Sequence, residues 1–526
     1  MWEGMARAFV CLLSGVVFVT TAFAGEVAER RCVTLRGVHL GENRILNQAR
    51  QRELFAPYMG KCIDGKLLKA VIADISTFYI KRGYITTHPY LEKQSITDGQ
   101  IDIRVLQGTV EDIVDASTKK PSGRTRTAFA FQKGRMLNLR DMETSLEMMN
   151  RPPSSHAAFE IKPGSKPGAS VIEVKNHDTS PWHLQLGLTG RRQADRNEGF
   201  VTVEASLDNP LNINDILTFR LNGEQLSRRH QSTRAGEIDY AFPISSYLLE
   251  FIASKSFYRQ GIQGINDTFL ADGNTTGLRT KISKVLMRNQ TNKLTLAASV
   301  IHNINKNFLA NQLIQVSSYK TTVAQLDVTH LWLWRQGSLT TAYSFERGTN
   351  WFGARKDGFF GAQTGSPGQA RLQFVKHELD MSLDERFPFG GIRLTSRAHL
   401  QRTLDALFDN DKLSVGGDYT VRGYPDGSLY GNNAWYVRSD LTRSWAVNLS
   451  PALLQSASLF AGYDYGHARC ETDNPLSCGN IHGVAGGFRT QGNRLTSALT
   501  VGWPLKKVSA SFKRRPTLRL DMTWRI

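Results

Sequence analysis

The chain has 526 residues, a length that predicts two to four structural units rather than one. Hydrophobic residues make up 40% of it and charged residues 21%, an average composition that favours neither a disordered chain nor a bundle of membrane helices. The formal net charge of +18 is compatible with nucleic acid, anionic lipid headgroups or a polypeptide in a basic channel, but the basic residues are scattered, which disfavours a dedicated nucleic-acid surface.

Residues 1–24 have the pattern of a secretory signal peptide. Arg7 precedes a short apolar run that ends at residues 22–24 in Ala-Phe-Ala, the small-x-small pattern read by signal peptidase. Cleavage is expected before Gly25. A transmembrane anchor is disfavoured because the run is short and is interrupted by Ser14 and two threonines. No later stretch approaches the ~18 continuous apolar residues of a spanning helix, so the exported chain is expected to be soluble, surface-attached or a β-barrel.

Four cysteines remain once Cys11 has left with the signal peptide. An even number in an oxidising compartment predicts two disulfides, and proximity in the sequence favours Cys32–Cys62 and Cys470–Cys478. Zinc binding is disfavoured because neither pair has CxxC spacing or nearby histidines. We therefore expect both pairs to be structural and predict no metal site.

Residues 25–112 predict a small α+β unit. The segment 33–40 alternates apolar and polar residues and predicts a strand. An apolar stripe at helical spacing then follows Asp64, a good N-cap, and Gly83 is well placed to end that helix. The segment 99–108 alternates again and predicts a second strand.

Residues 113–180 predict a second, shorter copy of this plan. One apolar helical face extends over 139–149 and is ended by two prolines at 152–153. The segments 157–164 and 170–176 then predict a pair of strands around a turn rich in glycine and proline. The apolar stripes of both units are interpreted as their cores rather than as ligand sites.

From about residue 182 to the C-terminus the sequence consists of alternating segments, mostly about ten residues long, separated by turns rich in Asn, Gly and Asp. In the last one, TLRLDMTWRI (517–526), one face is apolar and the other carries Arg519, Asp521 and Arg525. A soluble sandwich also alternates. The number of segments, the aromatic content and the alternating C-terminal strand favour a transmembrane β-barrel with an apolar outer face and a charged inner face.

Several motifs resemble one family in the order in which that family has them. They are YIKRGYITT (79–87), DGQIDIRVLQG (98–108), KPGSKPGAS (162–170), LDNPLNINDIL (207–217), YAFPISSY (240–247), GGDYTVRGY (416–424) and GYDYG (462–466). The chain resembles the TpsB transporters of two-partner secretion, the haemolysin and haemagglutinin secretion and activation type. The resemblance implies two α+β POTRA domains, here 25–112 and 113–180, followed by an antiparallel barrel of about 16 strands at 181–526. The segment Arg82-Gly83-Tyr84 is the matching POTRA motif.

The resemblance also implies a function. Members of this family are outer-membrane pores of Gram-negative cells, with their POTRA domains in the periplasm. They secrete one large exoprotein that carries an N-terminal secretion domain, which the POTRA domains recognise. The implied partners are this exoprotein, outer-membrane lipid and the barrel-assembly machinery that inserts the chain, with no cofactor and no nucleic acid.

The resemblance assigns a site to the loop around 416–432, which carries Val421, Arg422, Gly423 and Tyr424 and is expected to fold back into the pore. Its arginine is implied to pair with Asp464 on the barrel wall, within the Gly462, Asp464, Gly466 motif. A guanidinium is a planar, permanently charged fork that suits one facing carboxylate. Without the resemblance, Arg422 would be interpreted as a solvated turn residue.

Three other functions compete with this one. An outer-membrane assembly or insertion factor of the same superfamily shares the VRGY loop but usually has another number of POTRA domains. A passive porin would not need periplasmic domains, and an enzyme is disfavoured because the sequence has no GxSxG, HExxH or other clustered catalytic residues. No catalytic residue is therefore assigned. Because only residues 25–31 would precede Cys32, no N-terminal plug helix is expected.

Overall fold

The computed structural model describes residues 32–41, 45–193, 196–224, 231–263, 267–358, 369–424, 428–471, 477–508 and 514–526. The predicted signal peptide, residues 1–24, lies outside these ranges. The chain forms two compact units: the first contains the chain up to Phe78 together with His88–Leu106, and the second contains Tyr79–Thr87 and Gln107–Ile526. None of the described helices is long and apolar enough to cross a membrane.

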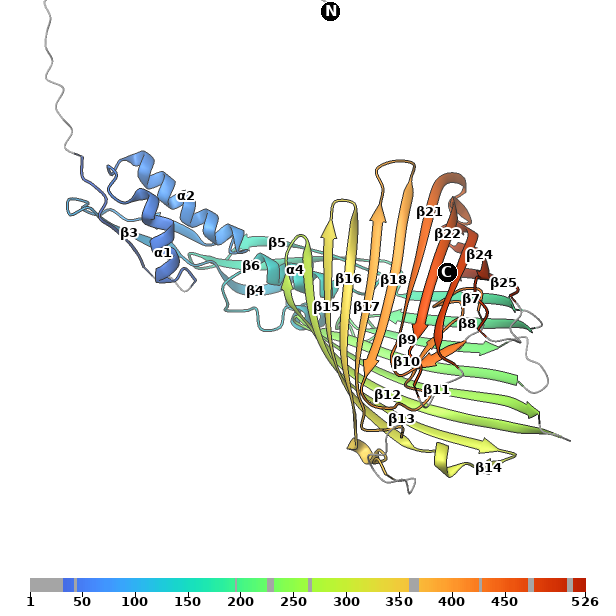
Figure 1. Cartoon of the computed structure of the whole chain (residues 1–526). Helices are drawn as coiled ribbons and strands as arrows, with labels where there is room; N and C mark the ends of the chain where they lie inside the picture. Colours follow the sequence, from blue (N-terminus) through green and yellow to red (C-terminus); the bar gives the residue numbers. More distant parts are fainter. Residues whose placement is uncertain are drawn as a thin grey trace, which may run out of the picture. The chain divides into compact units, whose positions relative to one another are not determined.

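The first unit is a three-stranded sheet accompanied by two helices (Figure 1). Its elements are β1 (Gly37–Leu40), α1 (Gln48–Phe55), the 3-10 turn η1 (Ala56–Tyr58), α2 (Gly65–Lys81), β2 (His88–Leu91) and β3 (Gln100–Leu106). The carboxylate of Asp64 accepts a hydrogen bond from the amide of Leu67 at 2.7 Å, which explains where α2 begins. Gly83 follows α2 at φ 92°, a left-handed conformation suited to a helix end.

The strand predicted over 33–40 is shorter than expected and begins only at Gly37. The residues before it are extended but pair elsewhere: the amide of Leu35 donates to the carbonyl of Lys61 and the amide of Ile63 to that of Val33. The Cys32–Cys62 disulfide joins the same two segments. The first part of the predicted strand therefore pairs with the segment before α2 and not with the sheet.

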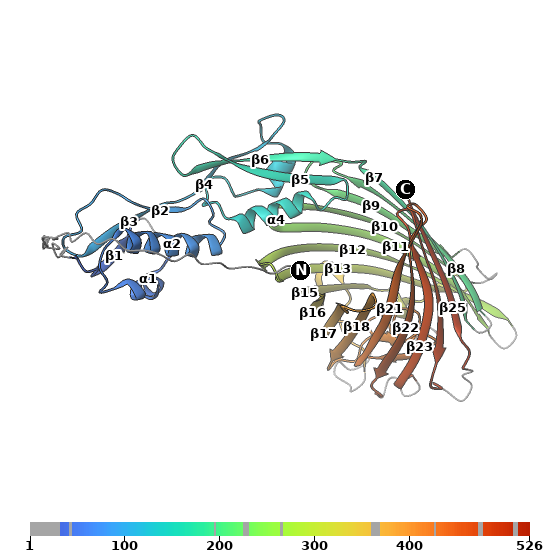
Figure 2. The ribbon, with the colours of Figure 1, turned by 90° about the horizontal axis from the view of Figure 1, so that it is seen from above.

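The second α+β domain contains a sheet in the order β4-β6-β5. Its elements are β4 (Thr109–Asp115), α3 (Gly123–Ala128), α4 (Leu139–Met149), β5 (Ser155–Pro163) and β6 (Ala169–Asp178), with α4 lying alongside β5 (Figure 2). Its core is apolar and includes Val110, Phe129, Leu137, Met142, Met149 and Ile172. The domain boundary predicted at residue 112 falls inside β4, which pairs with β6, so this sheet begins three residues before that boundary.

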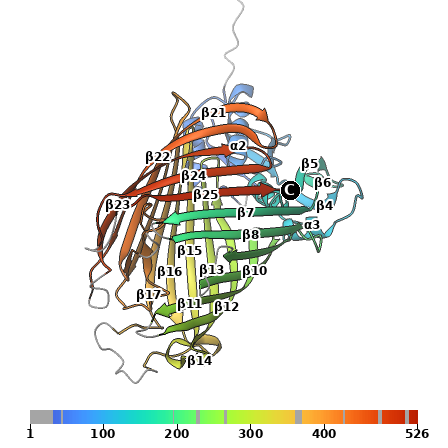
Figure 3. The ribbon, with the colours of Figure 1, turned by 90° about the vertical axis from the view of Figure 1, so that its right-hand side faces the viewer.

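Sixteen long strands of the described chain close into one antiparallel barrel, with the two-residue β14 (Gln312–Leu313) beside β13. They are β7 (Trp182–Gln193), β8 (Arg196–Asp208), β9 (Ile216–Glu224), β10 (Gln231–Ile244), β11 (Tyr247–Gln263), β12 (Thr268–Arg288), β13 (Asn292–Leu309), β15 (Lys320–Trp334), β16 (Gly337–Thr349), β17 (Val375–Arg386), β18 (Ile392–Thr403), β21 (Ala434–Ser450), β22 (Leu454–Ala468), β23 (Gly479–Gln491), β24 (Leu495–Pro504) and β25 (Thr517–Arg525). The barrel closes where β25 runs antiparallel beside β7 (Figure 3). Two 3-10 turns, η2 (Gln315–Ser317) and η3 (Trp351–Gly353), lie in the connections.

The two faces of the barrel wall have opposite character. On β25, Leu518, Leu520 and Met522 are exposed on the outer surface, whereas Arg519 and Asp521 pair with each other on the inner one. An apolar outer face and a charged lumen are the pattern of a barrel that spans a membrane.

The connections at the two ends of the barrel differ in length. Those at the end where the second domain leads into β7 are short, for example 245–246 and 335–336, whereas 350–374 and 404–433 at the other end are long. In outer-membrane barrels the short turns are periplasmic and the long loops extracellular. The second domain is therefore on the periplasmic side.

A polar joint ties the second domain to the turn between β8 and β9. Arg124 on α3 is 4% exposed, and its Nε donates to the side chain of Asn214 in that turn at 3.1 Å. Its two terminal nitrogens donate to Asp178 at 2.7 Å and to Ser155 at 2.9 Å. The side chain of Asn214 in return donates to the carbonyl of Arg124 at 2.8 Å. One arginine thus connects α3, the start of β5 and the end of β6 to the barrel.

Candidate functional site

The connection between β18 and β21 folds into the barrel instead of extending away from it. It contains a short hairpin of β19 (Leu413–Val415) and β20 (Leu429–Gly431). Its apolar residues pack on the inner wall and form a buried cluster of Val415, Val421, Tyr424, Leu429, Ala434, Ala468 and Ile481. Residues 425–427 of the loop lie outside the described residues. The loop therefore has a core of its own, which it shares with the wall.

Arg422 is the most deeply buried charged group of this loop, with 1% of its surface exposed. Its Nε donates to one carboxylate oxygen of Asp464 at 2.7 Å and its Nη2 to the other at 2.6 Å. The backbone amide of Arg422 donates to the same carboxylate at 2.9 Å. Asp464, on β22, is itself fully buried. The contact is a bidentate, charge-assisted pair reinforced by a third hydrogen bond.

A second carboxylate on the wall completes the arrangement. Nη2 of Arg422 also donates to Asp440 of β21 at 2.6 Å, and the other oxygen of Asp440 accepts from Arg489 of β23 at 2.8 Å. The guanidinium of Arg489 lies 3.8 Å from the ring centroid of Phe460, close enough for a cation–π contact. Arg422 is thus held by two carboxylates, one of which is shared with a second arginine.

Glycines on the wall make room for the loop. A Cβ on Gly462 would lie 2.3 Å from Nη2 of Arg422 and 2.4 Å from an Asp440 oxygen, and one on Gly466 would lie 2.3 Å from Val415. The same holds on the next two strands, where a Cβ on Gly483 would lie 2.2 Å from the carbonyl oxygen of Arg422 and one on Gly502 2.7 Å from the amide of Gly423. These distances are too short for any side chain, so the wall is shaped to this loop.

Gly423 and Tyr424 fix the loop beyond the arginine. Gly423 has φ 90°, and a Cβ there would meet the backbone of Trp503 at 2.5 Å. The Tyr424 hydroxyl lies 2.9 Å from the carbonyl oxygen of His482 and 2.8 Å from that of Lys506, and it accepts a hydrogen bond from the Lys506 amide at 2.9 Å. Each of the four residues 421–424 therefore has a distinct contact.

The loop also contacts the place where the barrel closes. The carboxylate of Asp418 lies 3.3 Å from Arg519 of β25 and 3.6 Å from Arg191 of β7. The guanidinium of Arg519 stacks on Tyr419 at 4.7 Å and donates to its hydroxyl at 2.9 Å. The residues that precede Arg422 are therefore bound to both the first and the last strand of the barrel.

A lumenal cavity of about 630 Å³ lies beside the loop and is lined by six arginines and four aspartates among other residues. Most of these charges are paired, but Arg397 of β18 forms no hydrogen bond or ion pair with the described part of the chain. Within that part there is also no group of three or more His, Cys, Asp or Glu side chains placed to hold a metal ion. The cavity is lined mainly by charged and polar side chains.

Comparison with known proteins identifies the family. The sequence pattern described as "Haemolysin secretion/activation protein ShlB/FhaC/HecB" matches residues 168–490. The chain belongs to this family. Residues 33–108 match the ShlB-type POTRA domain and residues 109–163 match a POTRA domain.

Relatives of known name agree with this assignment. The outer membrane transporter CdiB of Dickeya dadantii is 28% identical over 487 residues, 92% of this chain and 84% of that protein. The hemolysin transporter protein ShlB of Serratia marcescens is 25% identical over 80% of this chain and 75% of its own length. The solved structure of CdiB from Escherichia coli superposes with a TM-score of 0.84 at 26% identity, covering 97% of this chain and 93% of that one. The chain is thus a TpsB-type outer-membrane transporter with two POTRA domains and a 16-stranded barrel.

The POTRA motif Arg82-Gly83-Tyr84 makes backbone contacts with the segment that leads into α4. The carbonyl of Gly83 accepts from the amide of Leu139 at 2.8 Å, and that of Arg82 accepts from the side chain of Asn138 at 3.0 Å. A Cβ on Gly83 would lie 2.4 Å from the Asn138 side chain. In this TpsB-type chain the motif therefore contacts the start of α4.

The two cysteine pairs are disulfide-bonded, Cys32 to Cys62 and Cys470 to Cys478. The second bond brackets the extracellular connection after β22. Beside it the carboxylate of Glu471 accepts from the side chains of Asn432 and Asn433, at 2.5 and 2.7 Å, at the end of the lumenal loop. The surface loop and the lumenal loop are thus joined at their bases.

The TpsB motifs include Arg422 and Asp464 but not Asp440, Arg489, Gly483 or Gly502. These four residues lie on three other strands, and the register of those strands with β22 cannot be derived from the spacing of residues in the sequence. Alternation would have placed Asp440 on the inner face, and Asp440 is in fact the register partner of Gly462. Alternation therefore indicates that Asp440 faces the lumen, but nothing in the sequence indicates that Asp440 pairs with Arg422.

Proposed function

We propose that this chain secretes one large exoprotein across the outer membrane, through its own barrel. The observation that carries the proposal is a lumenal loop held to the wall by the ion pairs of Arg422 and by a small apolar cluster, inside a barrel that follows two POTRA domains. The ion pairs can be exchanged for contacts with water or with a passing chain, and the apolar cluster is small. The loop would then be displaced, or shifted, when the partner enters.

The partner would be recognised in the periplasm. Each POTRA sheet has three strands, and both outer strands, β1 and β2 in the first sheet and β4 and β5 in the second, are paired on one side only within the described chain. An extended segment of the exoprotein's N-terminal secretion domain could add to such an edge by main-chain hydrogen bonds. In this proposal the pore is kept closed by the VRGY loop, residues 421–424, together with Gly462, Asp464 and Gly466 of the wall. The motif Arg82-Gly83-Tyr84 supports the POTRA domains.

Further partners follow from the location. The outer face of the barrel would contact outer-membrane lipid, and the barrel-assembly machinery would insert the chain. No enzymatic step is part of this proposal. An assembly or insertion factor of the same superfamily is the competing function, in which the barrel would open at the β7–β25 junction and not at the loop.

The deciding experiment expresses the chain together with the exoprotein encoded beside it. Export to the medium or cell surface is expected with the chain and not without it, and equal export in both cases would refute the proposal. Arg422→Ala is expected to leave the barrel in the outer membrane but to reduce secretion at least about tenfold, because removing one member of a buried ion pair costs about 3–5 kcal/mol.

Arg397→Ala is the matched control for Arg422→Ala. This arginine faces the same lumenal cavity but has no bond to the described residues, so secretion is expected to remain at the wild-type level. Equal loss in both variants would mean that lumenal charge in general matters, and that the Arg422 contact has no special role.

A further inference from the structure

The outer surface of the barrel carries a groove with basic side chains near its extracellular edge. It has a volume of about 990 Å³ and crosses β8 to β12. Its outward lining includes the cations Arg234, Lys255 and Arg259 and the apolar residues Val203, Leu221 and Phe257. This volume falls within the range of about 300–1,000 Å³ that small-molecule sites occupy.

The strand register places the three cations on the face that contacts lipid. In the lumen, Arg220 pairs with Glu204 at 2.9 Å and also with Glu237. Because side chains alternate, Gly236, next to Glu237, faces outward, and its register partner is Lys255. Arg234 and Arg259 are each an even number of residues from these positions and therefore share the outward face.

The depth of the cations in the membrane follows from β11. Near its periplasmic end the hydroxyl of Tyr247 accepts a hydrogen bond from Lys284 at 2.9 Å, an aromatic and a cation at one interface. Ten residues of strand from Tyr247 to Phe257 rise about 25 Å at a tilt of about 40°, the height of the apolar band of such barrels. Phe257, an outward-facing aromatic residue that is 48% exposed, therefore lies at the height expected for the outer interface.

The three cations therefore surround this boundary. Arg234 is the register partner of Phe257, Arg259 is two residues further out, and Lys255 is two residues further in, with its amine 5.2 Å from the ring centroid of Phe257. All three are exposed and form no hydrogen bond or ion pair with the described residues. Asp272, the acidic residue of the lining, is the register partner of Arg259 and offsets part of this charge, although it forms no ion pair with the three cations. Their charge is available to a ligand from the membrane.

The floor of the groove consists of glycines that the fold does not require. A Cβ on Gly223 would meet no atom within 4 Å, and one on Gly236 would meet only the side chain of Leu221, at 3.4 Å. Neither position has a positive φ. The missing side chains leave open space over these glycines, between the apolar side chains of Val203, Leu221 and Phe257.

We propose that this groove binds a phosphorylated, acylated glycolipid of the outer leaflet, with its phosphates on Arg234, Lys255 and Arg259 and an acyl chain over Gly223 and Gly236. Outer leaflets of Gram-negative outer membranes are made of such lipid, and clustered cations beside an apolar groove are the means by which membrane proteins bind anionic headgroups. An exposed lysine or arginine at this depth reaches the interface without leaving its charge in hydrocarbon.

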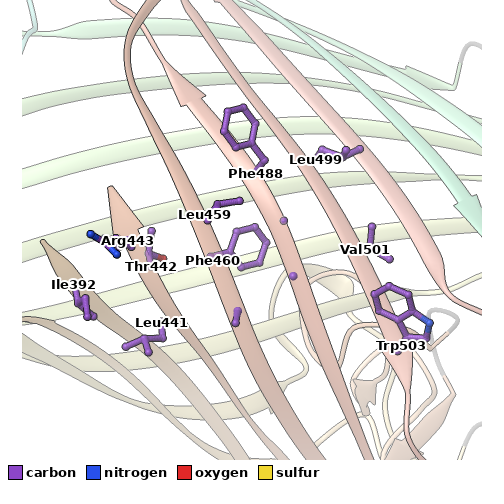
Figure 4. Close-up of a pocket in the computed structure, with 13 residues that line it drawn as sticks. Ile392, Leu441, Thr442, Arg443, Leu459, Phe460, Phe488, Leu499, Val501 and Trp503 are labelled. Carbon is purple, nitrogen blue, oxygen red and sulfur yellow. The ribbon is translucent and has the colours of Figure 1, made fainter. Parts of the chain in front are cut away.

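A second outward hollow provides an internal control. It has a volume of about 630 Å³ and lies among Leu459, Phe488 and Leu499 on β22 to β24 (Figure 4). Arg443 is the one charged residue of its lining, and it lies seven residues before the periplasmic end of β21. This hollow has apolar walls but lacks a cluster of cations, and it lies nearer the periplasmic leaflet of the membrane.

The test measures binding of bisphosphorylated lipid A to the purified full-length protein in detergent, by native mass spectrometry over a concentration series. The wild type is expected to hold one lipid A and to bind phosphatidylglycerol at least about tenfold more weakly, with no competition from inorganic phosphate. The triple variant R234Q/K255Q/R259Q is expected to lose at least about tenfold in lipid A affinity. Arg443→Gln is expected to bind like the wild type.

A second variant separates the groove from the charges. Gly223→Leu with Gly236→Leu fills the floor, keeps all three cations and is expected to weaken lipid A binding to a similar extent. Unchanged lipid A affinity in either the triple or the filled variant, or phosphatidylglycerol bound as tightly as lipid A, would overturn the proposal. Heat-dependent gel migration of each variant verifies that the barrel is folded, and single substitutions at the three cations replace any multiple variant that fails this criterion.

Discussion

Arg422 can reach its two carboxylate partners because Gly462 has no side chain. A Cβ there would lie 2.3 Å from Nη2 of Arg422 and 2.4 Å from an oxygen of Asp440, so the ends of these side chains would have to shift. The methyl group of an alanine must therefore displace the guanidinium from Asp464, even though all three charged residues are still present.

We expect Gly462→Ala to reproduce the secretion defect of Arg422→Ala, with at least about a tenfold loss, and to increase cysteine labelling at a reporter placed at Tyr419. Gly486→Ala, on the neighbouring strand, is the matched control, because its Cβ would meet nothing nearer than 3.6 Å. If Gly462→Ala secretes like Gly486→Ala, then the close fit between wall and loop has no role in secretion.

The resemblance to a family could identify Arg422 and Asp464, because both lie in motifs of that family, whereas composition and spacing alone left Arg422 a solvated turn residue. It could not identify Asp440 or Arg489. Alternation assigns a residue to a face, but the distance between two inward residues on different strands depends on the register of those strands, which turn lengths and bulges set.

At the scale of elements, the joint between α3 and the β8–β9 turn is built on Arg124. This side chain is 4% exposed and donates to Asn214, Asp178 and Ser155. Its removal leaves the buried side chains of Asn214 and Ser155 without this donor, at a cost of about 1–3 kcal/mol, whereas Asp178 is partly exposed to water. The joint should loosen without any effect on the barrel strands, whose own hydrogen bonds are unchanged.

Arg124→Ala is therefore expected to speed proteolytic cleavage between β6 and β7 severalfold, while heat-dependent migration of the barrel stays at the wild-type value. Arg126→Ala is the control, since Arg126 is on the same helix but exposed. Cleavage at the same rate in all three proteins would show that Arg124 does not hold the second domain to the barrel.

The helices and most strands could be predicted at this scale. α4 was expected over 139–149 and is Leu139–Met149, since an apolar stripe and following prolines define it. α3 was not expected, because its six residues, GRTRTA, carry no apolar stripe. β11, β12 and β13 are longer than the expected ten residues, because strands of such barrels continue beyond the membrane where alternation no longer has to be apolar.

At the scale of the whole molecule, the junction between β7 and β25 distinguishes two mechanisms. In one, the exoprotein is secreted through the lumen, and in the other, a chain is inserted through an opened barrel wall. The two strands pair over Thr517–Arg525 and Gln185–Gln193. A barrel that secretes through its lumen can keep these hydrogen bonds, whereas one that inserts other chains must expose this edge.

A disulfide between Leu188→Cys and Met522→Cys, which are register partners, would lock that junction. Secretion by the locked, oxidised barrel is expected to equal that of the same variant after reduction. Each cysteine alone serves as the control. A block of secretion that is relieved by reductant would instead support the insertion mechanism.

The shared carboxylate of Asp440 has one more consequence, for the state in which the loop has left the wall. Arg489 still pairs with Asp440 there, and Asp464 is left beside Arg438, its register partner on the neighbouring strand. Two carboxylates then face two guanidinium groups, so these four residues give the vacated wall no net charge. Neither a basic nor an acidic stretch of a polypeptide in transit would be held there strongly, because each of the four charges already has an opposite charge close by. A pore that closes by ion pairing would thus stay open to cargo of either sign.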